Sequence, residues 1–248
     1  MVSAMANRQK ATESLQDELD AVHHQMETAV DELYLPLREL VRAELRNTAP
    51  PVRAAIVLAA GVGNPDSDLL REGRIVLAAS LEMLAVALHI HRRLLTPTAT
   101  TGASSNPVTD DSTADRAWLG SMILAGDYCF SRSAVLAART DHPEVVKIFA
   151  NALKAVSEGH LRDHFTEQTL AGQTTAFDEN QLLFAAGARA AATLAALPTQ
   201  VIEALADYSG KLSQVVPPHS MAEPPCPVYQ SERWQALLTW LKQTAASV

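Results

Sequence analysis

The stretch that decides the fold is residues 68–95, DLLREGRIVLAASLEMLAVALHIHRRLL. Apolar residues occupy nearly all faces of a helix drawn through it, although Glu82 interrupts the run. A helix that is apolar all round is buried on every side, so this pattern predicts a helix in the middle of a bundle. The apolar positions are Ile75, Val76, Leu77, Leu81, Leu84, Val86, Leu88 and Ile90.

Helical spacing continues on both sides of this segment. Leu15 to Leu33 predicts a first helix, and Pro36 either kinks that helix or begins a second one. Residues 96–113 are rich in Thr, Ser, Asn, Pro and Gly and predict a mobile loop, while the Pro-rich stretch 217–227 predicts a rigid connector. The remaining helices are expected over Ala54–Val62, Arg116–Arg139, from Pro143 onward, Glu179–Ala196, Pro198–Val216 and from Ser231 onward.

These segments together predict an all-α protein, an antiparallel bundle of eight to ten helices forming a single domain over residues 1–248. The chain has 20 Lys and Arg against 28 Asp and Glu, a formal charge of −8. Such a balance disfavours binding to a nucleic-acid backbone. We also expect no secretory signal and no membrane span, and two cysteines suit a reducing compartment, so a cytoplasmic location is predicted.

Several motifs resemble the trans-type polyprenyl diphosphate synthase family. Leu124-Ala125-Gly126-Asp127-Tyr128 resembles the family's LAGDYL stretch, and Glu158-Gly159-His160-Leu161-Arg162-Asp163 resembles its EGQxxD stretch. Glu82–His91 resembles the ELIHTASLIH helix, and Pro51-Val52-Arg53 keeps the last arginine of the RxRP entry. The order and spacing of these motifs imply the isoprenoid synthase helical fold.

The same resemblance implies two aspartate-rich motifs that hold Mg²⁺ for the diphosphate substrate, because Mg²⁺ prefers oxygen ligands. The first should follow His91, where Arg92-Arg93-Leu94-Leu95-Thr96 stands instead. The second should follow Val216, where Pro217-Pro218-His219-Ser220-Met221 stands. Arginine repels Mg²⁺ and proline ends a helix, so we expect no metal, no other cofactor and no catalytic residues in this chain.

Candidate site residues follow from the resemblance and from side-chain chemistry. Arg53, Arg92 and Arg93 are candidates to bind a diphosphate, since guanidinium groups suit phosphate oxygens; solvated arginines at a helix end are the alternative for Arg92 and Arg93. His160 and His164 have the spacing of metal ligands, yet a structural or surface role is favoured. The candidates to line a prenyl cavity, with plain core packing as the alternative, are Leu84, Ala87, Leu88, His91, Tyr128 and Gln214. The candidates for a dimer interface are Trp118, Met122 and Phe130.

The function expected from this pattern is a polyprenyl synthetase-like protein of isoprenoid biosynthesis. We predict a non-catalytic small or regulatory subunit of a heteromeric prenyl diphosphate synthase, in a homodimer or in a heterodimer with a catalytic subunit. One alternative is a non-enzymatic protein that binds a prenyl diphosphate or another lipid-like ligand in its apolar cavity. Another is a structural homodimer whose core is filled.

Overall fold

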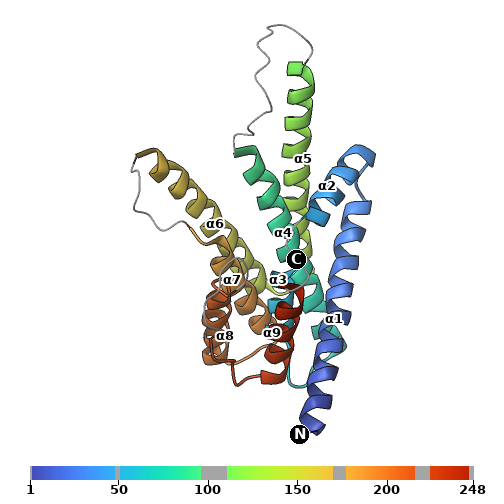
Figure 1. The fold of residues 1–248 in the computed structure, drawn as a ribbon, viewed down its shortest axis with the longest axis vertical. Helices are drawn as coiled ribbons and strands as arrows, with labels where there is room; N and C mark the ends of the chain where they lie inside the picture. The colour runs from blue at the N-terminus through green and yellow to red at the C-terminus, as the bar shows by residue number, and fades with distance from the viewer. Residues whose placement is uncertain (1, 48–50, 96–110, 170–176, 216–223, 246–248) are drawn as a thin grey trace.

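The computed structural model describes residues 2–47, 51–95, 111–169, 177–215 and 224–245. Within these ranges all regular secondary structure is helical, so the predicted all-α class is confirmed (Figure 1). The helices are α1 (Val2–Asp31), α2 (Leu35–Asn47), α3 (Val52–Ala60), α4 (Asp68–Leu95), α5 (Asp111–Ala138), α6 (Pro143–Thr169), α7 (Glu179–Leu194), α8 (Thr199–Leu212) and α9 (Ser231–Ala245).

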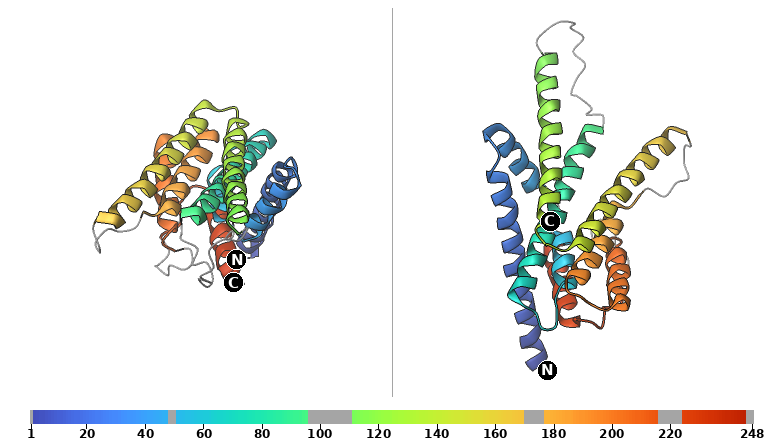
Figure 2. Two further views of the ribbon diagram at one scale, coloured as in Figure 1. Left: turned by 90° about the horizontal axis from the view of Figure 1, so that it is seen from above. Right: turned by 180° about the vertical axis from the view of Figure 1, so that it is seen from behind.

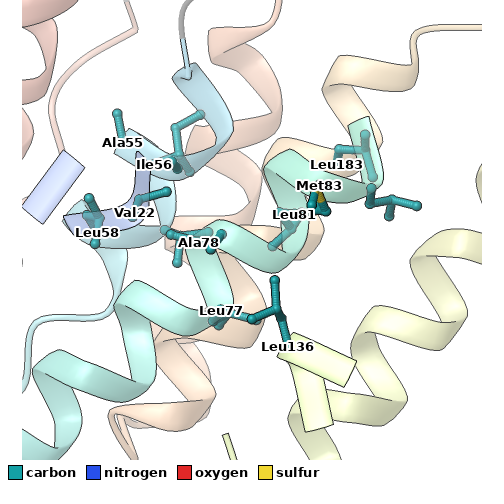
Figure 3. Close-up of a cluster of buried hydrophobic side chains, with 14 of the residues drawn as sticks. Val22, Ala55, Ile56, Leu58, Leu77, Ala78, Leu81, Met83, Leu136 and Leu183 are labelled. Carbon is teal, nitrogen blue, oxygen red and sulfur yellow. The ribbon is translucent and has the colours of Figure 1, made fainter. Parts of the chain in front are cut away.

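Helix α4 occupies the centre of the bundle, as its all-round apolar pattern predicts. It contacts α1, α3, α5 and α7, and Leu77, Leu81 and Met83 pack among buried side chains from these neighbours (Figure 3). By length and hydropathy α4 is apolar enough to cross a membrane, contrary to the expectation that Glu82 interrupts it too strongly. The most apolar window of this helix, however, is 83% buried inside the protein, which is typical of a core helix.

Local sequence explains most helix boundaries, and the structure corrects a few. Pro36 is the second residue of α2, so it begins a second helix rather than kinking the first. Proline is tolerated there because N–H groups in the first turn of a helix make no intrahelical hydrogen bond, so the missing N–H costs nothing. Helix α5 begins at Asp111, so residues 111–113 of the expected mobile loop are helical. The rest of that loop lies outside the described residues. Of the predicted connector, 224–227 is non-helical and 217–223 also lies outside them.

A buried ionic cluster holds the two terminal helices, α1 and α9, against α4. Glu18 of α1 is almost fully buried and accepts hydrogen bonds from Arg74 Nη2 at 2.6 Å, from Arg71 Nε at 3.2 Å and from Arg233 of α9. Asp66 accepts from Arg74 Nη2 at 2.9 Å. Buried charges require such pairing, so this cluster fixes how α1, α4 and α9 meet.

Helix α6 diverges from α4 and α5 along its length, in the views from the front (Figure 1) and from behind (Figure 2). Its first half packs near the end of α5, because only a four-residue connection separates Ala138 from Pro143. Its second half diverges from α5, and α6 packs against the following helix, α7. Of the sequence-predicted arginines, Arg92 and Arg53 contact the start of α7, whereas Arg93 contacts α2.

Candidate functional site

The C-terminal end of α4 carries the two arginines that stand where the family resemblance requires carboxylates. Arg92 Nη2 lies 2.7 Å from Glu179 Oε2 at the start of α7. Arg93 donates to Glu44 of α2, whose other carboxylate oxygen lies 3.6 Å from His89 Nε2. Each guanidinium is therefore paired with a carboxylate of this same chain, and neither is merely a solvated helix-end charge.

Arg53, the third candidate for diphosphate binding, lies at the start of α3 and faces the same region. Its Nη2 donates to Asn180 Oδ1 of α7 at 2.9 Å, and its Nη1 lies 3.4 Å from Glu82 Oε2 of α4. Burial raises the pKa of the Glu82 carboxyl above its usual value, although Arg53 and the N–H of Ala54 oppose this rise. Arg53 thus compensates a carboxylate that is buried in the core.

The start of α7 joins several helices, a role that the sequence did not reveal. Asp178 caps the helix by accepting from Gln181 N–H at 2.9 Å, and it also accepts from the Ser213 hydroxyl at the end of α8 at 2.7 Å. Carboxylates suit a helix N-terminus, where the backbone N–H groups are unpaired. Glu179 follows and contacts both α4 and α6. An aspartate before the helical run is a cap signal; nothing in the sequence indicates its partner on α8.

The residues of the EGQxxD-like stretch of α6 bind the segment that leads into α7. Asp163 Oδ2 accepts from the backbone N–H of Phe177 at 2.7 Å, and His160 Nε2 lies 2.8 Å from Glu179 Oε2. The Phe177 ring meets His160 edge to face, with centroids 5.4 Å apart, and occupies the space that a side chain at Gly159 would fill. His160 therefore has a structural role, which the sequence favoured. The side chain of His164 is not among those that the structure describes.

The candidates for a prenyl cavity do not gather around one opening. Leu84 and Ala87 are fully buried in the hydrophobic core and Leu88 is half-buried, which fits the alternative of plain core packing. His91 points at Gly126 of α5 and lies 3.4 Å from Asp127. None of the six predicted residues lines either of two surface grooves, of about 460 and 520 Å³, which lie beside α8 and beside the start of α4.

The remaining two cavity candidates lie apart from Leu84 and His91. The Tyr128 hydroxyl donates to the backbone oxygen of Ala29, so it ties α5 to α1. Gln214 is exposed just beyond the end of α8. The six side chains therefore make separate contacts in the structure, and their lining of one common prenyl cavity remains only a prediction.

The candidates for a dimer interface differ in their exposure. Trp118 on α5 is 44% exposed and Phe130 is half-buried. Met122 is fully buried in the core, so it cannot contribute to an interface, and that assignment was wrong. Trp118 and Met122 are four residues apart and lie on the same side of α5, so helical spacing alone does not tell which of the two is covered. The exposed neighbours of Trp118 are Leu119, Ile123 and Leu124.

The described residues at the end of α4 do not fit Mg²⁺. Within the ranges that the structure describes, no three side chains of His, Cys, Asp or Glu gather closely enough to hold a metal ion. The side chains that follow His91 are guanidinium groups already bound to carboxylates, and positive groups repel a divalent cation.

Comparison with solved structures identifies the fold. No family model and no curated protein sequence matches the chain. A decaprenyl diphosphate synthase from Rhodobacter capsulatus has a similar structure, with a TM-score of 0.64 at 21% identity, over 97% of this chain and 88% of that one. An isoprenoid synthase family member from Thermotoga neapolitana gives 0.60 at 15% identity, over 93% and 90%.

A polyprenyl synthase from Caulobacter crescentus, solved with calcium and isoprenyl diphosphate, gives a TM-score of 0.63 at 18% identity, over 84% of this chain and 67% of that one. The chain spans 60% of a geranylgeranyl pyrophosphate synthase from Lactobacillus brevis. The protein therefore has the isoprenoid synthase fold of the trans-prenyl diphosphate synthases, as the motifs predicted. At these identities the likeness shows the fold and not the activity.

Proposed function

We propose that this protein is a polyprenyl synthase-like protein of isoprenoid biosynthesis and acts as the non-catalytic, smaller subunit of a heteromeric prenyl diphosphate synthase in the cytoplasm. The observation that carries the proposal is the pairing at the end of α4. Arg92 and Arg93 replace the expected carboxylates and bind Glu179 and Glu44 of the same chain. A chain that has the isoprenoid synthase fold, but arginines at the positions expected for catalytic carboxylates, suits a subunit whose partner carries out the reaction.

Exposed apolar side chains in the first half of α5 support the requirement for a partner. Trp118, Leu119 and Ile123 are each more than 40% exposed, and Leu124 is 58% exposed. Large apolar side chains that are exposed within one short segment are typical of protein interaction sites. On this proposal the partner is a synthase that carries both aspartate-rich motifs, and it covers this segment in a heterodimer.

The test is a prenyl transfer assay with isopentenyl diphosphate, an allylic diphosphate and Mg²⁺. The purified chain alone should form no product. Co-expression with a motif-bearing synthase should yield a stable complex whose rate or product length differs from that of the synthase alone. Product formation by the isolated chain would contradict the proposal. So would a mixture that forms no complex and behaves as the synthase alone. A rise in melting temperature with a prenyl diphosphate, without complex formation, would instead favour the ligand-binding alternative.

A further inference from the structure

One carboxylate oxygen joins three helices at the region described above. Glu179 Oε2 of α7 lies 2.7 Å from Arg92 Nη2 of α4 and 2.8 Å from His160 Nε2 of α6. The Glu179 side chain is only 9% exposed, whereas Arg92 is 52% exposed. Burial of a carboxylate costs free energy unless charged or hydrogen-bonding partners compensate it, so Glu179 depends on these two contacts.

The groups around Glu179 are held in place by further contacts within the chain. On its own helix, Asp178 is occupied by Gln181 and Ser213, and Asn180 accepts from Arg53. On α6, Asp163 is occupied by the N–H of Phe177. The Phe177 ring, packed on Gly159 and His160, covers one side of the pair. The surroundings therefore keep Glu179 facing both α4 and α6.

This carboxylate lies where α6 has left the other helices. The second half of α6 diverges from α4 and α5 (Figures 1 and 2), so it lacks the continuous packing that α4 and α5 share. His160 lies in that half and reaches Glu179. Phe177 attaches the same part of α6 from the α7 side.

We propose that Glu179, with Arg92 and His160, is an internal ionic lock that holds the second half of α6 to α4 and α7 without any metal ion or diphosphate. Here an arginine of α4 and a carboxylate of α7 neutralise each other directly. The proposal concerns the isolated chain and does not require the proposed partner.

The experiment compares Glu179→Gln with Glu203→Gln on the purified full chain. Glu203 is a matched control because it also pairs with an arginine, Arg189, but bridges α7 and α8 at the exposed surface. Hydrogen exchange of residues 155–165 should become at least fivefold faster in Glu179→Gln, with a melting temperature lower by about 4 °C or more. Glu203→Gln should change neither the hydrogen exchange of residues 155–165 nor the melting temperature by a comparable amount.

Arg92→Gln gives a second variant should Glu179→Gln fold poorly, since Arg92 is half-exposed. It should accelerate exchange in the same peptides. The double variant Arg92→Gln/Glu179→Gln should be less destabilised than the sum of the two single ones. Additive effects, or a Glu179→Gln variant indistinguishable from Glu203→Gln, would overturn the lock.

A third arm tests independence from ligands. Hydrogen exchange of the wild-type chain is measured with Mg²⁺ and inorganic diphosphate together. We expect the exchange of residues 155–165 and 177–185 to stay unchanged. Clear protection of these peptides would overturn the proposal, because it would show a metal–diphosphate site in place of the internal lock.

Discussion

Ala196 ends α7 in a left-handed conformation, with φ of 52°. Its N–H donates to Thr193 O at 2.9 Å and the N–H of Leu197 to Ala192 O at 3.1 Å, the two bonds of a Schellman motif. Glycine is favoured at this position because it has no Cβ to strain. Ala196→Gly should therefore raise the free energy of unfolding by about 0.5–1 kcal/mol.

The neighbouring alanine gives the control for that prediction. Ala195 has φ of −77°, so a glycine there relieves no strain. Ala195→Gly should lower the free energy of unfolding by about 0.5–1 kcal/mol, because it only adds conformational freedom to the unfolded chain. Urea unfolding followed by circular dichroism measures both variants. Equal changes of the same sign would contradict the assignment of the cap.

Cys129 is a fully buried residue of α5. Burial raises the pKa of its thiol to about 12, so it stays protonated and unreactive at neutral and mildly alkaline pH. Cys226 is only partly buried. At pH 8 a disulfide reagent should modify Cys226 first in the folded chain, and both thiols only in denaturant. Mass spectrometry measures the modification of each thiol. Rapid modification of Cys129 in the folded chain would contradict this prediction.

At the scale of elements, the Glu18 cluster determines how the terminal helices attach. Burial lowers the pKa of Arg233 below its usual value although Glu18 opposes this, so the arginine depends on its carboxylate partner. Glu18→Gln should leave Arg74 and Arg233 buried without full compensation and cost about 3–5 kcal/mol. Asp17→Asn, an exposed neighbour on α1, should cost less than about 0.5 kcal/mol. Chemical denaturation measures both, and similar losses would contradict the role of the cluster.

At the scale of the whole molecule, the exposed apolar side chains in the first half of α5 should control association with the partner. Leu124→Glu puts a charge on the most exposed of them, and we expect it to abolish complex formation while the chain stays folded. Leu69→Glu is the matched control, because Leu69 is 81% exposed at the start of α4, on another helix. Light scattering after size-exclusion chromatography measures the assembly. Unchanged assembly in Leu124→Glu would exclude this segment.

The order of the helices follows from the sequence, because local rules set it. The all-round apolar pattern of residues 68–95 predicted a central helix, and the structure confirms α4 there. Pro143 marks a helix start because proline is tolerated in a first turn, whereas for Pro36 the sequence left a kink and a second helix open. The absence of carboxylates after His91 is also a property of the sequence alone.

Only the tertiary structure decided what the side chains of the candidate site touch. Arg92 and Glu179 are 87 residues apart along the chain, and no periodicity brings them together. Met122 and Trp118 are four residues apart on the same side of α5, yet one is buried and the other exposed, because the neighbouring elements cover this side of the helix at Met122 and less at Trp118. Spacing along a chain fixes secondary structure, whereas ion pairs and exposed faces depend on how distant helices pack.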